Sequence, residues 1–250
     1  MSGHSKWHNI RLRKGKVDAQ RGALFTKLSK EIILAAKSGS PDPEANYRLK
    51  MAVDKARENN MPMDNIKRAI ARAAGGEGAR DIEEVRYEGY GPSGVAVIVD
   101  AATDNRNRTA SEMRFLFSRN GGTLGESGSV SWQFEPRGLV EVESAGRSED
   151  QLTEAVLIDG VDDVRYDPER SEILTDVAAL QRVRETLASG GLKVTEARLS
   201  MEPKQTVALT GDAAAAVLKL LDALDEHEDV QQVYSNVDLS AADLEALAGA

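Results

Sequence analysis

The stretch LVEVESAGRSEDQLTEAVLIDGVDDVRYDPERSEILTDVAALQRVRETLASGGLKVTEARL (residues 139–199) decides the fold. Apolar and polar residues alternate in four short segments of this stretch, and two segments with helical spacing of apolar residues separate them. The order of the pieces is strand, helix, strand, strand, helix, strand. This βαββαβ order is typical of a ferredoxin-like α+β sandwich, in which two helices cover one face of a four-stranded sheet.

The segments on either side of this stretch lack strand partners of their own. Upstream, two strands joined by GYGPSG (residues 89–94) precede a helix over residues 105–119; downstream, a strand, a helix and a strand follow in residues 206–237. We therefore predict a discontinuous α+β domain, also ferredoxin-like, in which residues 82–130 pair with residues 203–238. Residues 131–202 form the domain inserted into it, opening with a hairpin between VSWQF and LVEVE across EPRG.

Residues 1–80 have a different pattern, an arm followed by three amphipathic helices. In the first helix Phe25, Leu28 and Ile32 share one face. The second is predicted to begin at Asp42 as N-cap, with Pro43 in its first turn. Short links between such helices favour an antiparallel three-helix bundle. The chain is thus predicted to be a multi-domain α+β protein, with a helical domain followed by two sandwich domains.

The composition excludes several classes of protein. The chain has no cysteine, which excludes disulfides, cysteine-ligated zinc, iron–sulfur clusters and thiol nucleophiles. The longest apolar runs are far shorter than a membrane span, and the N-terminus lacks the apolar core of a secretory signal. We expect a cytoplasmic protein without a membrane partner.

Charge is distributed unevenly along the chain. Residues 1–80 carry 17 Lys and Arg against 8 Asp and Glu, a net charge of +9, whereas residues 81–250 carry 15 against 33, a net charge of −18. A basic head suits a polyanion, and an acidic body is repelled by one. This polarity predicts that the protein meets nucleic acid in one orientation.

The densest cationic track opens the chain and includes Trp7. Lys and Arg can contact phosphate while a Trp stacks on a base, although the same run also fits a solvated tail with Trp7 packed against the helices. A second candidate is TDNRNRT (residues 103–109), which lies where a helix N-terminus can hold a phosphate; a structural Arg–Asp network is an equal alternative there. The candidate nucleic-acid-binding residues are Lys6, Trp7, Arg11, Arg13, Lys14, Lys16, Arg21, Lys27, Lys30, Arg106 and Arg108.

No catalytic, metal or cofactor constellation stands out. GYGPSG matches a dinucleotide fingerprint literally, but a strand follows it where the fingerprint needs a helix, so a tight hairpin turn is favoured. His4 and His8 have helical ligand spacing but only cationic neighbours, and His227 is interpreted as a solvated turn residue. DGVDDV (residues 159–164) lacks the ligand spacing of a calcium loop. We expect no cofactor, no metal and no enzymatic activity.

Six blocks of the chain resemble the YebC/PmpR family of bacterial regulatory proteins: GHSKWHNI, DAQRGALFTKLSKEI, NMPMDNIKRAI, YEGYGPSG, TDNRNRT and GGTLGESGSVSWQF. The resemblance implies a three-domain protein with a helical domain first, and a role in gene expression without catalysis. Family members are described as DNA-binding transcriptional regulators, and their mitochondrial relatives as translational activators; others act on the ribosome, aiding difficult stretches such as proline runs.

Several alternatives stay open at this stage. The partner is nucleic acid, either DNA or ribosomal RNA, and the ribosome is a further candidate. No helix carries a set of base-reading side chains, and an acidic body is costly beside a long duplex, so physical reasoning leans slightly to RNA. An acidic protein-interaction scaffold is the alternative to nucleic-acid binding. A monomer is expected.

Overall fold

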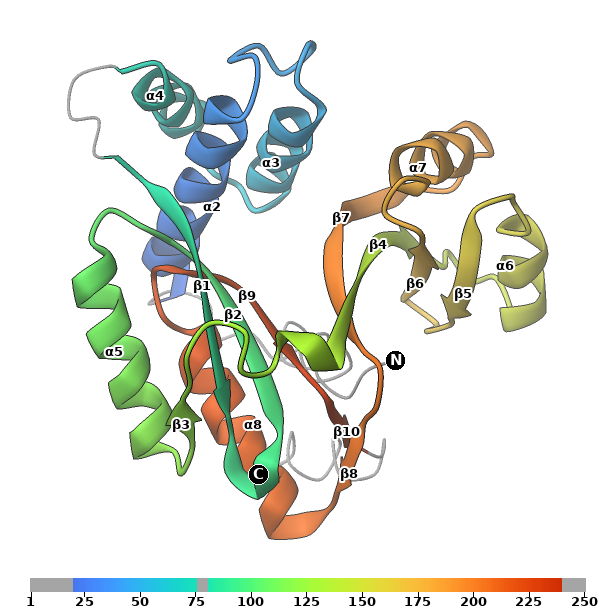
Figure 1. The fold of residues 1–250 in the computed structure, drawn as a ribbon. Helices are drawn as coiled ribbons and strands as arrows, with labels where there is room; N and C mark the ends of the chain where they lie inside the picture. The colour runs from blue at the N-terminus through green and yellow to red at the C-terminus, as the bar shows by residue number, and fades with distance from the viewer. Residues whose placement is uncertain (1–19, 76–80, 240–250) are drawn as a thin grey trace. The chain divides into compact units, whose positions relative to one another are not determined.

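The computed structural model describes residues 20–75 and 81–239. Residues 134–202 form one compact unit, and the described residues before and after them form a second unit. Each unit contains an antiparallel four-stranded sheet, and the second also contains the three N-terminal helices (Figure 1). The α+β fold class is therefore confirmed, while the three predicted domain boundaries stay a prediction. None of the described helices combines the length and the apolar character that a membrane span needs.

The three predicted N-terminal helices are present. Their shared core contains Leu28, Ile32, Leu49, Val53 and Ile66, all at most 3% exposed. The apolar stripes predicted from the sequence therefore face one another, which buries enough aliphatic surface to hold short helices together. The helices are α2 (Gln20–Lys37), α3 (Tyr47–Glu58) and α4 (Met63–Ala73).

The predicted start of the second helix is wrong by several residues. Asp42 does not cap a helix; its side chain accepts a hydrogen bond from the Glu44 N–H at 3.0 Å within a turn. Helix α3 begins at Tyr47, and the side chain of Asn46 accepts from the Leu49 N–H at 3.1 Å. Asn46 also donates to the carbonyls of Ala35 and Ser40, so it joins the turn to α2 as well as capping α3.

The sheet of the larger unit joins segments that are distant in sequence. Its strand order is β3-β1-β2-β9, and β2 pairs antiparallel with β9 through Ile98 and Tyr234 among others. The GYGPSG segment is the predicted tight connection between β1 and β2, with Ser93 and Gly94 in the left-handed region (φ +59° and +75°). The strands are β1 (Glu83–Tyr90), β2 (Ala96–Thr103), β3 (Thr123–Leu124) and β9 (Val230–Ser235); β8 (Val207–Leu209) and β10 (Val237–Leu239) form a separate parallel pair.

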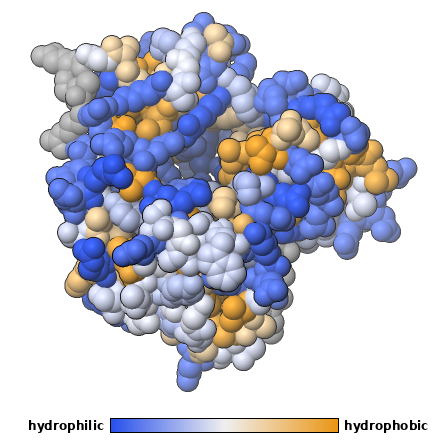
Figure 2. All heavy atoms as spheres, viewed as in Figure 1, coloured by the Kyte–Doolittle hydropathy of each residue, from blue (hydrophilic) through white to orange (hydrophobic). Residues whose placement is uncertain are grey.

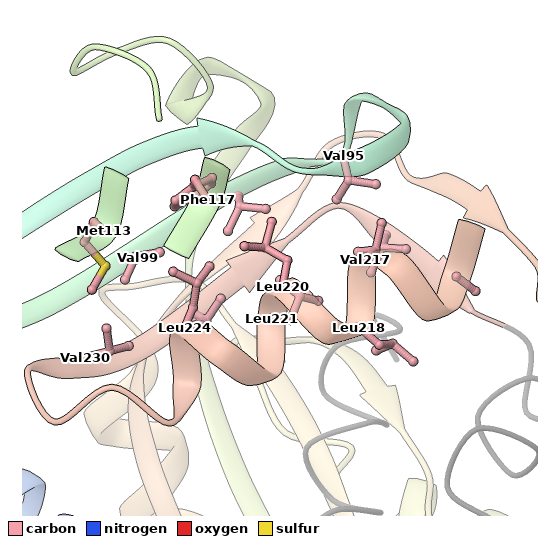
Figure 3. Close-up of a cluster of buried hydrophobic side chains, with 14 of the residues drawn as sticks. Val95, Val99, Met113, Phe117, Val217, Leu218, Leu220, Leu221, Leu224 and Val230 are labelled. Atoms are coloured by element: carbon pink, nitrogen blue, oxygen red, sulfur yellow. The ribbon is translucent and has the colours of Figure 1, made fainter. Parts of the chain in front are cut away.

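Two helices pack on this sheet, α5 (Arg106–Arg119) and α8 (Gly211–Asp225). Met113 and Phe117 from α5 meet Leu220 and Leu224 from α8 over Val99 of β2, and all five are fully buried (Figure 3). Because both helices contribute to one core, they lie on the same face of the sheet. This packing fixes the start of α5 and the end of α8, which carry the polar residues described below.

The smaller unit has the predicted βαββαβ order. Its sheet order, β5-β6-β4-β7, is that of a ferredoxin-like sandwich. Val140, Val142 and Ile173 of the sheet pack with Leu152 and Val183 of the two helices. The elements are β4 (Phe134–Glu143), α6 (Glu149–Ala155), β5 (Val161–Arg165), β6 (Arg170–Thr175), α7 (Leu180–Ser189) and β7 (Val194–Pro203).

The predicted hairpin across EPRG is wrong. Residues 131–133 form a short 3-10 helix, η2 (Ser131–Gln133), and β4 then runs without reversal through EPRG. Glu135 and Arg137 lie two residues apart and therefore on the same face of an extended strand, where they form a salt bridge with 2.9 Å between Arg137 Nη2 and Glu135 Oε1. Arg137 also pairs with Asp162 and Asp176. Its charge is therefore balanced while the backbone stays extended.

Candidate nucleic-acid interface

The structure describes only part of the predicted interface. Lys6, Trp7, Arg11, Arg13, Lys14 and Lys16 lie outside the described residues, as do His4 and His8. Arg21 stands in the first turn of α2. Four candidates have described side chains: Lys27 and Lys30 on α2, and Arg106 and Arg108 on α5.

The two lysines of α2 contact the acidic end of α8 and the residues after it. Lys27 Nζ lies 3.9 Å from Asp225 Oδ1 and also donates to the Asp225 carbonyl. Lys30 Nζ donates to the carboxylate of Asp229 and to the Glu228 carbonyl at 3.1 Å. Both lysine side chains are largely covered, at 18% and 12% exposure. These lysines therefore hold α2 against the segment that links α8 to β9.

Arg108 binds the same buried carboxylate from another direction. Its Nη2 lies 2.8 Å from Asp229 Oδ2 and 3.1 Å from Asp104 Oδ1. The Thr109 hydroxyl lies 2.6 Å from Asp229 Oδ2, and the Asp229 side chain has no exposed surface. One buried anion thus joins residues of α2, α5 and the segment before β9. Arg108 takes part in an Arg–Asp network of the kind that the sequence left open as an alternative.

The electrostatics of Asp229 follow from these contacts. Burial raises the pKa of its carboxyl, but hydrogen bonds from Lys30, Thr109 and Arg108 outweigh burial and lower the pKa to about 2. Asp229 is therefore charged at neutral pH. It neutralises charge on Lys30 and Arg108, which reduces what these two residues can offer to an external polyanion.

The TDNRNRT segment owes its shape to helix capping. The Asn105 side chain accepts from the Arg108 N–H at 3.1 Å, and the Asn105 N–H donates to Thr103 Oγ1 at 2.9 Å. Capping fixes the first turn of α5 and so the direction of Arg108. Arg106, by contrast, is 65% exposed, with its guanidinium 3.6 Å from Glu83 at the surface. Of the two arginines, Arg106 is the one open to solvent.

A pocket of about 440 Å³ lies beside this network. Arg72 of α4 lines it, and Arg72 is exposed. The remaining lining residues are Lys30 and Arg108, the acids Asp104 and Glu228, the hydroxyl-bearing Thr26 and Ser29, and the apolar Ile33 and Ile82.

The interpretation of His227 as a solvated turn residue is wrong. The side chain is 14% exposed, and its Nδ1 accepts a hydrogen bond from the Asp229 N–H at 3.1 Å. That bond leaves Nε2 to donate to Glu112 Oε2, 3.0 Å away. The physical reason is that the chain turns back against α5 directly after α8, a contact between residues 115 positions apart that no local pattern reveals.

Glu112, His227 and Asp229 bring three potential metal ligands within 4.8 Å of one another. Their polar atoms are already engaged: His227 Nδ1 with a backbone N–H, and Asp229 with Lys30, Arg108 and Thr109. Two adjacent cations also oppose a divalent ion. The donor set fits a closed hydrogen-bond network better than a metal centre.

Helix α4 carries three exposed cations that are not among the candidate residues named from the sequence. Lys67, Arg68 and Arg72 lie on the side of α4 away from its buried residues Ile66 and Ala69, and all three are exposed. Arg68 donates to Asn65 and to the Asp64 carbonyl. Within residues 20–75 and 81–239, no carboxylate forms a salt bridge with any of the three. The sequence already places these three residues off the apolar stripe of the helix, where they continue the basic track of the N-terminal region.

Comparison with known proteins agrees with this architecture. The model of the TACO1/YebC protein N-terminal domain matches residues 5–76, and the model of the TACO1/YebC second and third domain matches residues 82–237. A "probable transcriptional regulatory protein" of Pelotomaculum thermopropionicum is 50% identical over 96% of this chain and 99% of its own length. One of the same description from Sulfurihydrogenibium sp. is 49% identical over the whole of both chains.

A solved structure is also similar. The crystal structure of a conserved hypothetical protein from Aquifex aeolicus superposes with a TM-score of 0.84 at 46% identity, covering 90% of this chain and 93% of that one. The matched family models together cover most of the chain, from the basic helices to β9 in the sheet of the larger unit. The chain therefore belongs to the TACO1/YebC family, the YebC/PmpR family that its sequence blocks resemble.

Proposed function

We propose that this protein is a non-enzymatic regulator of gene expression that binds nucleic acid through its basic N-terminal region. The names of its relatives support a regulatory role. The charge distribution supports the mode of binding, because a net charge of +9 in residues 1–80 adjoins a net charge of −18 in the remainder. Such polarity draws a phosphate backbone to one end of the molecule.

The observation that carries the proposal is the contrast among the described cations. Lys27, Lys30 and Arg108 are paired with the protein's own acids, whereas Lys67, Arg68 and Arg72 of α4 are exposed and form no salt bridge with a described carboxylate. Exposed cations that no described carboxylate neutralises are the groups that can replace the counterions of a phosphate backbone. We therefore assign backbone contact to α4 and to the arm cations, and a structural role to the paired residues.

The test compares two triple variants in a binding titration with labelled nucleic acid. Changing Lys67, Arg68 and Arg72 to Gln should weaken binding of all sequences alike, because phosphate contacts carry no sequence information. The matched control changes Arg114, Arg119 and Lys219 to Gln, three exposed cations of α5 and α8 that likewise form no salt bridge with a described carboxylate, and should leave affinity unchanged. Equal effects of both triple variants would overturn the assignment of contact to the N-terminal region.

The nature of the polymer, DNA or ribosomal RNA, is addressed by a separate experiment. Crosslinking in cells, followed by identification of the nucleic acid attached to residues 1–30, distinguishes promoter DNA from ribosomal RNA. An acidic body is costly beside a long duplex, so we expect structured RNA. Recovery of promoter DNA would support the transcriptional role in the relatives' names. Recovery of neither would favour a protein-interaction scaffold.

A further inference from the structure

The loop before β4 presents an exposed tryptophan. Trp132, in η2, is 66% exposed, more than Phe115 or Tyr90 in the same unit. Leaving an indole in water forgoes a large hydrophobic gain, about 25 cal/mol for each Å² that burial would cover. Because tryptophan is enriched at interfaces, an exposed indole on an ordered loop is a candidate contact residue.

Hydrogen bonds orient the indole ring. Its Nε1–H donates to the Ser129 carbonyl at 3.0 Å, and the Tyr90 hydroxyl donates to the same carbonyl at 3.0 Å. The backbone carbonyl of Trp132 accepts from Lys204 Nζ at 2.8 Å. The polar atom of the ring is thus already satisfied, which leaves the flat aromatic surface as the feature offered to a partner.

A buried carboxylate holds the loop that carries this ring. Glu88 of β1 is 4% exposed and accepts from the N–H groups of Gly128 (2.9 Å), Val130 (2.9 Å) and Ser131 (2.8 Å). Burial raises the pKa of Glu88, but these backbone hydrogen bonds outweigh burial, and the net pKa is lowered. The loop is therefore anchored by a charged group at three successive points.

The glycines of the loop are required by this close anchoring. A Cβ on Gly125 would lie 2.4 Å from Ser129 Oγ, and Gly128 has φ +87°, a conformation that side chains disfavour. The loop is consequently preorganised, so that a ligand stacking on Trp132 pays little to order it.

We propose that Trp132 is a stacking platform for an unpaired nucleobase, with the Lys204 ammonium beside it for the adjoining phosphate. The inference rests on the proposed nucleic-acid binding and specifies what it recognises. An indole with its N–H engaged internally stacks on any base without reading hydrogen bonds, and only an unpaired base offers its face. One N–H of the Lys204 ammonium goes to the Trp132 carbonyl, and the side chain is exposed. Such a cation favours a polyanion over an uncharged proline-rich peptide, the other ligand class that stacks on exposed aromatic residues.

Intrinsic fluorescence tests the proposal directly, because the chain has two tryptophans, Trp7 and Trp132. The W7F variant makes Trp132 the single indole. Adding a short single-stranded oligouridylate should quench its emission saturably, and an RNA duplex of the same length should not. In the wild-type background W132A should weaken binding of the single strand by roughly 5- to 150-fold, the effect of losing one base–aromatic stack.

Two further variants make the result specific. W132F keeps an aromatic face and should retain most of the affinity. F115A removes another exposed aromatic side chain of the same unit, whose ring already lies 5.8 Å from the Arg119 guanidinium, and should change nothing. Because Trp132 and Phe115 are both exposed, each variant is expected to fold.

The outcomes separate this inference from the function on which it rests. Unchanged affinity in W132A, together with unquenched emission from W7F protein that still binds the labelled oligonucleotide, overturns the platform and leaves the proposed function standing. Absence of binding by the wild-type protein overturns both. Quenching by an oligoproline peptide and not by the oligonucleotide overturns the base as occupant and identifies a peptide instead.

Discussion

A buried carboxylate in the larger unit and a partly buried one in the smaller unit have opposite protonation behaviour. Asp229, in the larger unit, has its pKa lowered to about 2, whereas Glu141, on β4 of the smaller unit, has its pKa raised to about 7. Burial raises the pKa in both cases. At Asp229 the surrounding hydrogen bonds outweigh burial, whereas at Glu141 burial is the largest influence and the neighbouring acids add to it.

Two acids and two arginines surround Glu141. Beyond burial, the charge of Glu196 on β7 raises its pKa most, and Glu172, its cross-strand partner on β6, raises it further; Arg198 and Arg170 act in the other direction. Asp229 instead receives hydrogen bonds from two cations and a hydroxyl. An acid that accepts hydrogen bonds from cations stays charged at neutral pH, while a partly buried acid whose neighbouring acids outweigh its arginines binds a proton near neutral pH.

The largest expected effect comes from removing the charge of Asp229. The substitution Asp229→Asn keeps the shape but leaves Lys30 and Arg108 without their shared counter-charge, and should lower the free energy of unfolding by about 3 to 5 kcal/mol. Urea denaturation at neutral pH measures the change. Its matched control is Glu228→Gln, the exposed neighbouring carboxylate, which should change little. Equal losses in both variants would contradict a special role for Asp229.

The second prediction concerns Glu141 and the pH dependence of stability that it causes. Because the folded pKa of Glu141 is raised from 4.5 to about 7, its favourable contribution is complete below pH 4.5 and is lost as the pH rises through 7. The wild-type unfolding free energy should therefore fall by about 3 kcal/mol more than that of Glu141→Gln between these limits.

Denaturation of both proteins across this pH range tests the prediction. Glu143→Gln, two residues along the same strand, is the control and should follow the wild-type curve. Parallel curves for wild type and Glu141→Gln would show that Glu141 does not titrate in this window.

The third prediction concerns Asp229, for which stability depends on pH in the opposite direction. A depressed folded pKa contributes stability that is present above the unfolded value of 3.8 and is lost as the pH falls through about 2. The stability gap between wild type and Asp229→Asn should therefore narrow by about 2 kcal/mol between pH 4 and pH 2. A constant gap over this interval would mean that the carboxylate is not held in its charged form by Lys30 and Arg108.

The smallest expected effect is that of an exposed salt bridge, which serves as the reference for the effects at Asp229 and Glu141. Arg48 and Glu84 form a salt bridge at the surface, with side chains 51% and 58% exposed. The substitution Glu84→Gln should change the free energy of unfolding by less than about 0.5 kcal/mol, because solvent screens exposed pairs. Double-mutant analysis with Arg48→Met measures the coupling. A coupling as large as that at Asp229 would show that burial is not needed for strong pairing.

Local pattern explains the parts of the fold that could be predicted. Alternation and helical spacing in residues 139–199 specified the βαββαβ order, and the strand-to-helix change at Asn105 indicated the start of α5. The wrong predictions concern positions where the local sequence fits two structures equally well. Asp42 and Asn46 are both good caps, and only the carbonyls of Ala35 and Ser40 decide for Asn46. In EPRG, the salt bridges of Arg137 favour extended backbone over a turn.

The candidate site was less predictable because it is built from long-range contacts. Lys30 and Asp229 are 199 residues apart, and Arg108 and Asp229 are 121 apart, so the sequence could name the cations but not their partner. Trp132 was predicted to lie in a strand of the hairpin across EPRG, whereas it lies in η2. The Gly- and Ser-rich run before it indicated a loop, but its exposure depends on the distant anchor Glu88. Figure 2 shows that hydrophilic residues cover much of the face in view. Residue type alone therefore does not identify which of them would contact a partner.

The salt dependence of nucleic-acid binding tests the central claim most directly. The measurement compares wild type with a variant in which Arg11, Arg13, Lys14 and Lys16 are all changed to Gln. If these residues bind phosphates, the wild-type affinity should fall steeply with salt, and the variant should lose about 3 from the slope of log K against log salt concentration. An identical slope in the two proteins, at unchanged affinity, would contradict the account.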